Sequence, residues 1–419
     1  MKDEKRTTEC GDGKISRRDF IAGAGAAATS FVLIKPSLVR GTEANSKIKL
    51  GIIGCGMRGK WITDLFQKHG GYEIFAAADY FQDRVDELGE QFGVDKARRY
   101  ATLSGYKKLL ESGVDAVAVE SPPYFHAEQA AAAVDAGVHV MVAKPATVDV
   151  PGCKLIGLSG KKATAKKLVF YVDFQTRANE FYREAVKRAQ YGEIGRMVCG
   201  EASFKCGDVW KHGWNPVEPI LKENPTDPET RLKAWGLDKV LSGDILVEQT
   251  IHAIDVATWI LDADPVSAYG SGGRKHYEYG DIWDHFVAIY HFPNNVLVNL
   301  IAKQCDGGHF GNIGCTMYGL DGAIDTRYGG KVSILGSNPY KGGETGNLYP
   351  EGTSANIATF YDNITKGQFA NTTVGPSVRS NLASILARDA AYKGSVLTYD
   401  EMLKANEKLE SDVIKGLKA

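Results

Sequence analysis

Two stretches of this chain carry side chains that could exchange a proton with a hydroxyl group. Lys144 directly follows an apolar, strand-like run at residues 138–143. Far along the chain, Glu248, His252 and Asp255 recur at i, i+4 and i+7. On a helix this spacing puts them on one face, where Glu248 could hydrogen-bond one ring nitrogen of His252 and raise the basicity of the other. The pattern indicates a general base; the alternative is an exposed ion pair without a chemical role.

A glycine pattern near the start of the chain indicates which cofactor could work with these groups. An apolar, β-branched run at residues 48–53 leads into Gly54-x-Gly56-x-x-Gly59, and a helix-compatible run follows at 60–68. In a dinucleotide-binding unit, the first glycine makes a tight turn, the second admits the pyrophosphate and the third packs helix against strand. The helix N-terminus then faces the phosphates. A glycine-rich turn with no ligand is the alternative, since 47 glycines make the spacing alone a weak signal.

The end of a second apolar run, at residues 72–78, points to NAD as the dinucleotide. Asp79 follows that run, 20 residues after Gly59, where the ribose-binding acid of such units occurs. A carboxylate there accepts hydrogen bonds from the adenosine ribose and repels a 2′-phosphate, so NAD is favoured over NADP. The expected cofactor contacts are Asp79 and the loop residues Gly54, Cys55, Gly56, Met57, Arg58 and Gly59. The thiol of Cys55 itself fits a small, buried filler.

The first 45 residues resemble a targeting signal and are excluded from the fold. Arg17 and Arg18 precede a moderately apolar stretch at 21–34, which Lys35-Pro36 closes. This order is typical of twin-arginine export, and the stretch is too short to span a bilayer. A soluble basic tail is the alternative. Ala44 is a weak candidate for a cleavage site, so we expect a periplasmic protein that could remain tethered to the membrane.

Length and composition bound the remaining interpretation. About 375 of the 419 residues follow the signal, enough for two domains, and 43% hydrophobic residues supply ordinary cores. A formal charge of −1 argues against a nucleic-acid partner. The seven cysteines form no C-x-x-C pair or histidine cluster, so neither a metal site nor a disulfide framework is indicated. No later segment of the sequence is apolar enough for a membrane helix.

The order of expected elements predicts an α/β protein of two domains. Residues 46–175 alternate strand and helix, which predicts an N-terminal Rossmann domain with a parallel sheet; the strands are expected near 48–53, 72–78, 114–120, 138–143 and 168–173. Residues 176–419 are expected to form a C-terminal α/β domain for substrate binding and oligomerisation. Its alternating, aromatic-rich runs predict a large, mostly antiparallel open sheet. Its closing helices, expected at 354–366, 378–392 and 399–414, could pack back on the Rossmann domain.

Polar residues follow several of the expected parallel strands, at the edge where open α/β sheets bind ligands. We expect five of them to contact the cofactor: Ser121, Pro122, His126, Lys144 and Gln175. Arg177, two residues after the last of these, is expected to contact the substrate. His126 could instead pack at the start of its helix, and Lys144 could be a solvated lysine at a strand end.

Together these motifs resemble the glucose-fructose oxidoreductase/inositol dehydrogenase/MocA (Gfo/Idh/MocA) family, in its exported branch. Family members carry G-x-G-x-x-G, then P-x-x-x-H, which matches residues 122–126, and then E-K-P, which matches 143–145. They also carry Q-x-R, matching 175–177, and a glycine-, Asp- and His-containing element that matches 243–255. A closing pattern with I-L-x-R-x-A-A-Y matches 385–392. The resemblance covers essentially the whole chain after the signal.

The resemblance implies a Rossmann domain joined to an open-sheet domain, often assembled as a dimer or tetramer, and oxidation of a sugar or polyol hydroxyl with NAD(P). By analogy, Lys144 would hydrogen-bond the reacting hydroxyl, His252 would take its proton, and Glu248 would stand where most relatives have Asp. A hydride would move from the carbinol carbon to nicotinamide C4. Ala143 departs from the pattern, since it replaces the usual Glu. Export of the folded protein further suggests that NAD stays bound and is recycled by a second sugar.

Aromatic and polar residues of the second half suit a pyranose ring, which has an apolar face and a rim of hydroxyls. The expected substrate contacts are Lys144, Arg177, Trp210, His212, Trp214, Trp235 and His252. Ordinary loop packing is the alternative for the tryptophans. Two other functions stay open: an NAD-dependent glycoside hydrolase with a transient 3-keto intermediate, whose known examples typically lack the lysine of E-K-P, and a redox-inactive NAD-binding protein.

Overall fold

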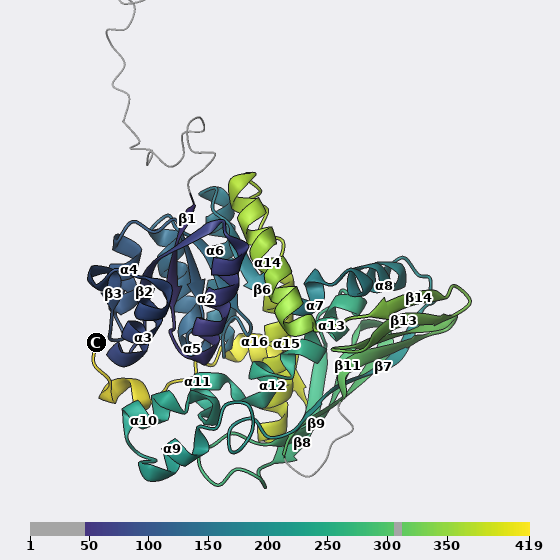
Figure 1. Ribbon diagram of the computed structural model, residues 1–419. Coiled ribbons are helices and arrows are strands. Elements are labelled where there is room, and N and C mark those ends of the chain that lie inside the picture. Colours follow the sequence, from purple (N-terminus) through teal and green to yellow (C-terminus); the bar gives the residue numbers. More distant parts are fainter. Residues whose placement is uncertain (1–46, 306–311) are drawn as a thin grey trace, which may run out of the picture. The chain divides into compact units, whose positions relative to one another are not determined.

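The computed structural model describes residues 47–305 and 312–419, so the predicted export signal lies outside the described residues. Six parallel strands form the first sheet in the order β3-β2-β1-β4-β5-β6 (Figure 1). They are β1 (Ile48–Ile53), β2 (Tyr72–Ala78), β3 (Arg99–Tyr100), β4 (Ala116–Val119), β5 (His139–Ala143) and β6 (Phe170–Asp173). The strand order reverses between β1 and β4, so the carboxyl ends of these two strands flank the crevice in which such sheets bind ligands.

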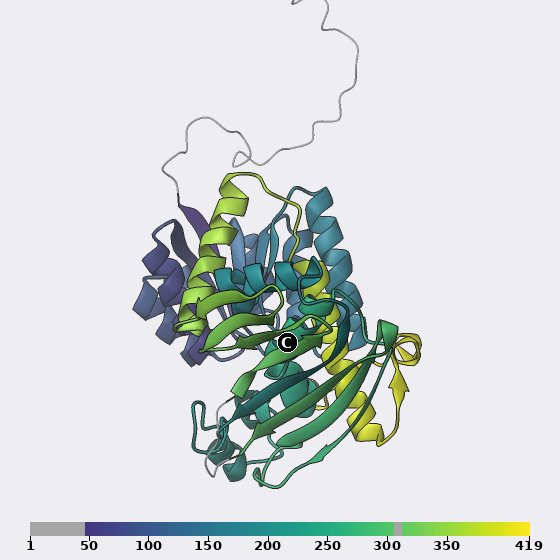
Figure 2. The same ribbon diagram turned by 90° about the vertical axis from the view of Figure 1, so that its right-hand side faces the viewer.

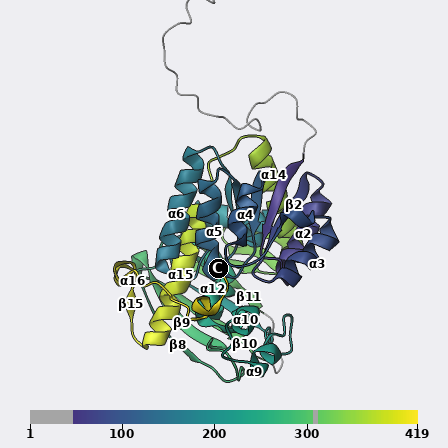
Figure 3. The same cartoon turned by 90° about the vertical axis from the view of Figure 1, so that its left-hand side faces the viewer.

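Two hydrophobic clusters cover the two faces of this sheet. One is formed with α4 (Gly105–Glu111), α5 (Pro123–Asp135) and α6 (Val150–Ala165), and the other with α2 (Met57–His69) and α3 (Gln82–Phe92). Helices from the far end of the chain complete both clusters. Helix α14 (Leu348–Thr365) packs beside α2, and α15 (Val374–Lys393) packs beside α6 (Figure 3). The C-terminal half therefore supplies part of the core of the Rossmann sheet.

The second sheet has nine strands in the order β14-β13-β12-β11-β7-β10-β9-β8-β15. Figure 2 shows the molecule from the side on which this sheet lies. They are β7 (Met197–Cys206), β8 (Ser267–Gly273), β9 (His285–Phe292), β10 (Val296–Gln304), β11 (Asn312–Gly319), β12 (Gly322–Arg327), β13 (Lys331–Gly336), β14 (Tyr340–Glu344) and β15 (Leu397–Thr398). Only the β7–β10 pair is parallel among the described strands of this sheet. The predicted fold class, a parallel Rossmann sheet plus a mostly antiparallel sheet, is confirmed.

One face of the second sheet is covered, and the cover includes a helix that carries a predicted catalytic residue. Helix α13 (Ile251–Leu261) packs on β7 and β11, and α15 packs on β8. Strand β9 shows the resulting alternation, with residues at every second position buried. Among the described residues, no helix is both long and apolar enough to cross a membrane.

The predicted closing helix at 399–414 is wrong in extent. Helix α16 (Tyr399–Ala405) begins with a capping box at Thr398 and Glu401, and it ends because Asn406 adopts a left-handed backbone with φ 48°. A short 3-10 turn, η5 (Val413–Gly416), follows after an extended segment. A left-handed residue satisfies the last helical carbonyl and turns the chain away from the helix axis. The turn frees the last residues to run back toward the Rossmann domain.

Candidate active site

The glycine loop after β1 is shaped for close approach of a ligand. Gly54 has φ +98°, and a Cβ there would lie 2.5 Å from the backbone nitrogen of Ser121. A Cβ on Gly59 would lie 1.9 Å from the carbonyl oxygen of Gly54. Around Gly56, in contrast, the nearest atom to an added Cβ is an Arg84 nitrogen at 3.8 Å. Two glycines thus allow tight packing, while Gly56 leaves open space beside the N-terminus of α2, which fits a dinucleotide pyrophosphate.

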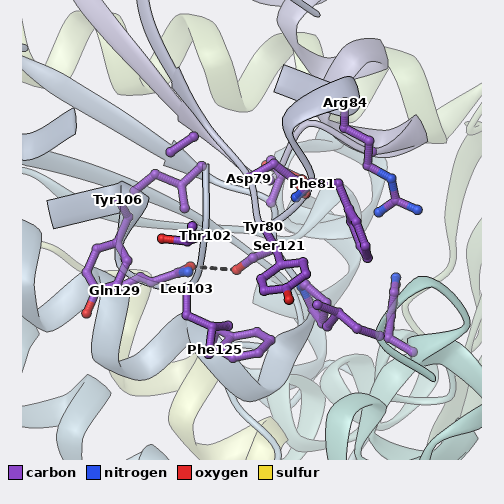
Figure 4. Close-up of a pocket in the computed structure, with 18 residues that line it drawn as sticks. Asp79, Tyr80, Phe81, Arg84, Thr102, Leu103, Tyr106, Ser121, Phe125 and Gln129 are labelled. Carbon is purple, nitrogen blue, oxygen red and sulfur yellow. Dashed lines mark hydrogen bonds between the residues drawn. The ribbon is translucent and has the colours of Figure 1, made fainter. Parts of the chain in front are cut away.

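Asp79 is one of the residues that line a cavity of about 80 Å³ beside this loop (Figure 4). Its Oδ2 accepts a hydrogen bond from the Cys55 amide at 2.7 Å, and its Oδ1 accepts one from the Phe81 amide at 3.0 Å. Burial raises the pKa of Asp79, which nearby Arg84 and these two amides partly counteract. Each carboxylate oxygen keeps a second lone pair, so the two together can receive the two hydroxyls of an adenosine ribose.

We call this cavity the adenosine-side cavity, because Asp79 is the expected ribose contact. Many of its lining residues were not singled out by the sequence. Tyr106 and Gln129 lie on two different helices, and Ser121 Oγ donates to Gln129 Oε1 at 2.6 Å (Figure 4). Leu232 reaches the cavity from the second half of the chain, as does Trp235, which the sequence predicted as a substrate contact. The remaining unpredicted lining residues are Ile53, Ala78, Tyr80, Phe81, Arg84, Thr102, Leu103, Glu120 and Phe125. Arg84 is notable because a guanidinium near the ribose acid can also accommodate a 2′-phosphate.

A larger cavity of about 380 Å³ is also lined by residues of the glycine loop, and it brings both predicted proton-exchanging groups together. Lys144 comes from the end of β5, and His252 from the first turn of α13. Twelve predicted residues line it: Gly56, Met57, Arg58, Gly59, Ser121, His126, Lys144, Trp210, Trp214, Trp235, Glu248 and His252. The cavity therefore combines cationic, basic and aromatic side chains beside a dinucleotide-shaped loop.

Lys144 is tied to Glu248 in this cavity. Its Nζ donates to the main-chain oxygen of Glu248 at 2.5 Å and lies 3.2 Å from the carboxylate Oε1. Only 9% of the Lys144 side chain and 13% of the Glu248 side chain are exposed. Burial lowers the pKa of Lys144, and the carboxylate of Glu248 opposes this. A partly desolvated ammonium with a fixed carboxylate partner is well suited to donate a hydrogen bond to a substrate oxygen.

The expected helical pairing of Glu248 with His252 is wrong. Glu248 ends α12 (Asp244–Glu248), and Gln249 and Thr250 interrupt the helix before α13 begins. The His252 amide donates to the oxygen of Gln249, three residues back, instead of to Glu248. The main-chain oxygen of Glu248 is therefore free of this helical hydrogen bond, and it accepts the one from Lys144 Nζ. The predicted ion pair on one helix face is thus replaced by a pair between two distant parts of the chain.

His252 stands among aromatic rings instead. Its ring is stacked on Phe204 with centroids 6.3 Å apart and lies 5.3 Å from the Tyr328 ring. Burial, with the positive charges of Lys144 and Arg58, holds the pKa of His252 well below its usual value. The ring is therefore neutral near pH 7 and has one basic nitrogen. A neutral imidazole in a cavity beside an ammonium is suited to accept a hydroxyl proton.

Four predicted contacts do not line either cavity. Cys55 is buried, and its Sγ lies 3.5 Å from the Ala78 carbonyl oxygen. Gln175 is buried and donates to Asp173 and Thr353. The guanidinium of Arg177 is held by Asp255 at 2.8–3.2 Å. His212 is exposed, and its amide caps the Asp208 carboxylate. Gln175 and Arg177 thus hydrogen-bond other side chains of the protein and do not line either cavity.

The other predicted contacts differ in their surroundings. The ring nitrogens of His126 lie 2.8 Å and 2.6 Å from the carbonyl oxygens of Pro145 and Ser121, so this histidine joins two loops at the cavity wall. Trp210 is buried and packs edge-on to Trp235, with centroids 5.6 Å apart. Trp214 is 58% exposed at the mouth. Pro122 lines the adenosine-side cavity.

Polar atoms without partners point to the kind of ligand that the larger cavity could hold. Within the described part of the chain, four buried polar atoms of its lining residues have no hydrogen-bond partner: Glu120 Oε1, Trp210 Nε1, Glu248 Oε2 and His252 Nδ1. Buried polar atoms are normally paired, because an unpaired one costs about 1–3 kcal/mol. A ligand rich in hydroxyl groups can both donate to the oxygens and accept from the indole nitrogen. The set therefore fits a polyhydroxylated molecule.

Comparison with known families agrees with this site. A family model described as "Oxidoreductase family, NAD-binding Rossmann fold" matches residues 48–172, and one described as "GFO/IDH/MocA C-terminal domain" matches 182–325. The chain belongs to the GFO/IDH/MocA family. Its first domain is the NAD-binding Rossmann domain of that family, and NAD is its cofactor. The glycine loop, the open space at Gly56 and the acceptor pair of Asp79 all fit this cofactor.

Individual relatives include dehydrogenases and a hydrolase. Inositol 2-dehydrogenase 3 of Saccharopolyspora erythraea is 28% identical over 282 residues, which are 66% of this chain and 72% of that protein. Glycosyl hydrolase family 109 protein 1 of Bacteroides thetaiotaomicron is 28% identical over 177 residues, 40% of this chain and 37% of that protein. The crystal structure of scyllo-inositol dehydrogenase from Lactobacillus casei with NAD(H) and scyllo-inositol aligns with a TM-score of 0.65 at 18% identity, covering 85% of this chain and 100% of that one.

Proposed function

We propose that this protein is an NAD-dependent dehydrogenase that oxidises a hydroxyl group of a sugar, a polyol or a glycoside. One observation carries the proposal: a paired lysine and a neutral histidine, Lys144 and His252, line the same cavity as the glycine loop. The inositol dehydrogenases among its relatives support the polyhydroxylated substrate class. A carbohydrate also matches the unpaired buried atoms and the tryptophans of the cavity.

In this reaction the chain's own groups handle the proton and orient the hydroxyl. Lys144, oriented by Glu248, donates a hydrogen bond to the reacting oxygen and stabilises the negative charge that develops there. His252 accepts the hydroxyl proton on its basic nitrogen, because its low pKa keeps the ring neutral before the reaction. When bound, oxidised nicotinamide supplies the acceptor for the hydride from the carbinol carbon.

A panel of free sugars, polyols and aryl glycosides tests this proposal. Formation of a keto product with a rise in absorbance at 340 nm supports the dehydrogenase. Release of the aglycone without net NADH would instead support the second candidate, an NAD-dependent glycoside hydrolase with a transient 3-keto intermediate, which the hydrolase relative favours. A protein inactive on the whole panel that still binds NAD would fit a redox-inactive NAD-binding protein and would refute both enzymatic readings.

The C-terminal segment supports a second part of the proposal, that NAD stays bound through turnover. Val413 is buried in a cluster with Phe81, and the Leu103 amide donates to the Lys418 carbonyl oxygen at 3.2 Å. The Lys418 amide donates to the Tyr80 hydroxyl at 3.1 Å. Phe81, Leu103 and Tyr80 all line the adenosine-side cavity. A chain end fastened to three walls of that cavity opposes release of the adenosine half, so a second sugar would reoxidise the cofactor in place.

Location and assembly complete the proposal. The paired arginines Arg17 and Arg18 support export to the periplasm by the twin-arginine route, with a membrane tether if the signal is retained. The open face of the second sheet supports a homodimer or homotetramer. Ile289 pairs with Tyr269 on β8, and Ile301 with Val287 on β9; all four side chains are 38–52% exposed. A second copy of this chain is the proposed cover, since the same apolar patch on each copy can meet its counterpart about a twofold axis.

A further inference from the structure

A carboxylate that the sequence motifs did not single out lies where the two cavities meet. Glu120 directly follows β4, and its amide donates to the Ile53 oxygen of β1 at 2.7 Å. It lines both the adenosine-side cavity and the larger cavity. Val119 of β4 pairs with Val142 of β5, so the next residue of each segment, Glu120 and Ala143, lies at the same edge of the sheet. Where the family pattern has a glutamate before the lysine, this chain has Ala143. Glu120 supplies a carboxylate at the same edge of the sheet, from the neighbouring strand.

The two oxygens of Glu120 have different surroundings. Oε2 accepts a hydrogen bond from Arg58 Nε at 2.8 Å, while Oε1 is buried and has no partner among the described residues. The Glu120 side chain has no exposed surface. Arg58 is shared, because its other nitrogens donate to Asp173 at 2.8 Å and to the Tyr349 hydroxyl at 2.6 Å. Glu120 therefore has one anchored oxygen and one oxygen that is free for a proton or a ligand.

The charges around Glu120 leave its protonation finely balanced. The charged groups near it are Arg58 from α2, Asp173 from β6 and Lys144 after β5, and Tyr349 of α14 lies on the far side of Arg58. Together with Glu248, three carboxylates face two cations. Burial raises the pKa of Glu120 to about 7, although Arg58 and Lys144 lower it. If all three carboxylates are ionised, the buried group carries one excess negative charge.

We propose that Glu120 binds a proton when the cofactor is reduced and releases one when it is oxidised, so that it is the final acceptor of the proton from the substrate hydroxyl. The inference rests on the proposed use of NAD in a redox reaction. Oxidised nicotinamide carries one positive charge, which reduction removes. An ionised Glu120 balances that charge in the oxidised state, and a protonated Glu120 keeps the buried group neutral in the reduced state. The net charge of the buried site is then the same before and after the reaction.

The step balances in atoms and electrons. The carbinol C–H bond breaks with its electron pair going to the cofactor, and the O–H bond breaks with its proton going first to His252 and finally to Glu120 Oε1. The carbonyl C=O bond forms as the only new bond in the substrate. Reduction of the keto-sugar runs the same sequence backward, so one proton and one hydride remain stored together in the protein between the two half-reactions.

A redox titration of the bound cofactor, followed at 340 nm from pH 5 to 9 with the purified holoprotein and no sugar, tests the proposal. Hydride uptake alone consumes one proton per two electrons, a slope of about 30 mV per pH unit, because a tenfold change in the equilibrium constant of a two-electron couple is about 30 mV. A second proton on Glu120 doubles the slope to about 59 mV. The positive charge of the oxidised cofactor lowers the pKa of Glu120, so the steep limb is expected below about pH 7.

Glu120→Gln keeps the shape of the side chain and removes the proton, so its slope should be about 30 mV per pH unit throughout. The matched control is Glu128→Gln on α5, an exposed carboxylate that lines neither cavity, which should retain the steep limb. A pH-indicator dye in weak buffer gives a second measurement: two protons taken up per reduced wild-type cofactor, and one in Glu120→Gln.

A wild-type slope of about 30 mV at every pH would overturn the proposal even if no variant folds. Because the titration contains no sugar, its result is independent of the substrate assignment. Failure of the sugar panel with a steep wild-type limb would reject the proposed function and keep only the binding of a proton by Glu120 on reduction of the cofactor.

Discussion

Replacing Lys144 by Met should separate its chemical role from its structural one. Methionine has a similar length and no donor, so the hydrogen bonds to the Glu248 carbonyl and carboxylate are lost. We expect turnover on the best substrate of the panel to fall by about 10²–10⁴-fold. The dissociation constant for NAD should change little, because Lys144 lines the larger cavity and is absent from the lining of the adenosine-side cavity.

The structure also bounds the stability cost of this change. A buried carboxylate that loses its partner typically costs about 3–5 kcal/mol. Chemical denaturation at pH 7 should therefore show that Lys144→Met lowers the free energy of unfolding by about 3–5 kcal/mol.

The double variant Lys144→Met/Glu248→Gln provides the control. It also removes the Glu248 carboxylate, which Lys144→Met alone leaves without a partner. Most of the stability at pH 7 should therefore return, while turnover stays low. Wild-type turnover in Lys144→Met would refute the assigned chemistry. Recovery of turnover in the double variant would show that Lys144 acts only by neutralising Glu248.

Four further predictions follow from other parts of the structure. Asp79→Ala should weaken NAD binding by about 10–100-fold, because hydrogen bonds to a charged acceptor are lost. It should also improve NADP binding, because Arg84 lies in the same cavity. Titration with both cofactors checks this, and the control Asp79→Ala/Arg84→Ala should lose the gain in NADP binding. Burial lowers the pKa of His126 to about 4, although the carbonyl oxygens of Pro145 and Ser121 oppose this, whereas the pKa in the unfolded chain is about 6.5. The unfolded state therefore binds more protons on acidification, and the free energy of unfolding should fall by about 2 kcal/mol between pH 7 and 5. His126→Gln should remove that part of the pH dependence in denaturation curves. Purified protein should hold near-stoichiometric NAD(H) after exhaustive dialysis and show parallel double-reciprocal lines for donor and acceptor sugars. Deletion of residues 408–419 should release the cofactor, because it removes the contacts of Lys418 with the cavity. Wild-type protein that is purified without NAD and gives intersecting lines would contradict cofactor retention. Ile289→Lys/Ile301→Lys on the open sheet face should give a monomer by light scattering, and an unchanged mass would place the contact elsewhere.

Local sequence patterns determined much of the architecture. The strand ends at residues 53 and 78 and the three glycines could be predicted, because buried parallel strands are continuous apolar runs and because Gly54 and Gly59 stand where no Cβ fits. Lys144 was predicted at a ligand-binding edge for the same reason. The exact end of α16 could not be predicted, because it depends on a left-handed Asn406, a conformation that asparagine permits without requiring.

The composition of the site depended on contacts between distant segments. A carboxylate directly after the apolar run 116–119 was the signal that could have revealed Glu120, but its burial and its bond to Arg58 come from chain segments 62 residues apart. The helix break at Gln249 redirected Glu248 from His252, four residues away, to Lys144, 104 residues away. Arg177 was drawn from the expected substrate contacts into a pair with Asp255.

The sequence by itself thus determined the fold class and the dinucleotide loop, because these follow from local hydrogen bonding, side-chain size and periodicity, and it singled out Lys144 and His252 for the proposed proton exchange. Only the tertiary structure decided which charges face one another and which polar atoms stay unpaired. Those properties depend on burial and on the packing of α12, α13 and the C-terminal segment against the Rossmann sheet. Charge interactions strengthen as water is excluded, so the chemistry proposed for Lys144, His252 and Glu120 depends on the assembled cavity rather than on any one motif.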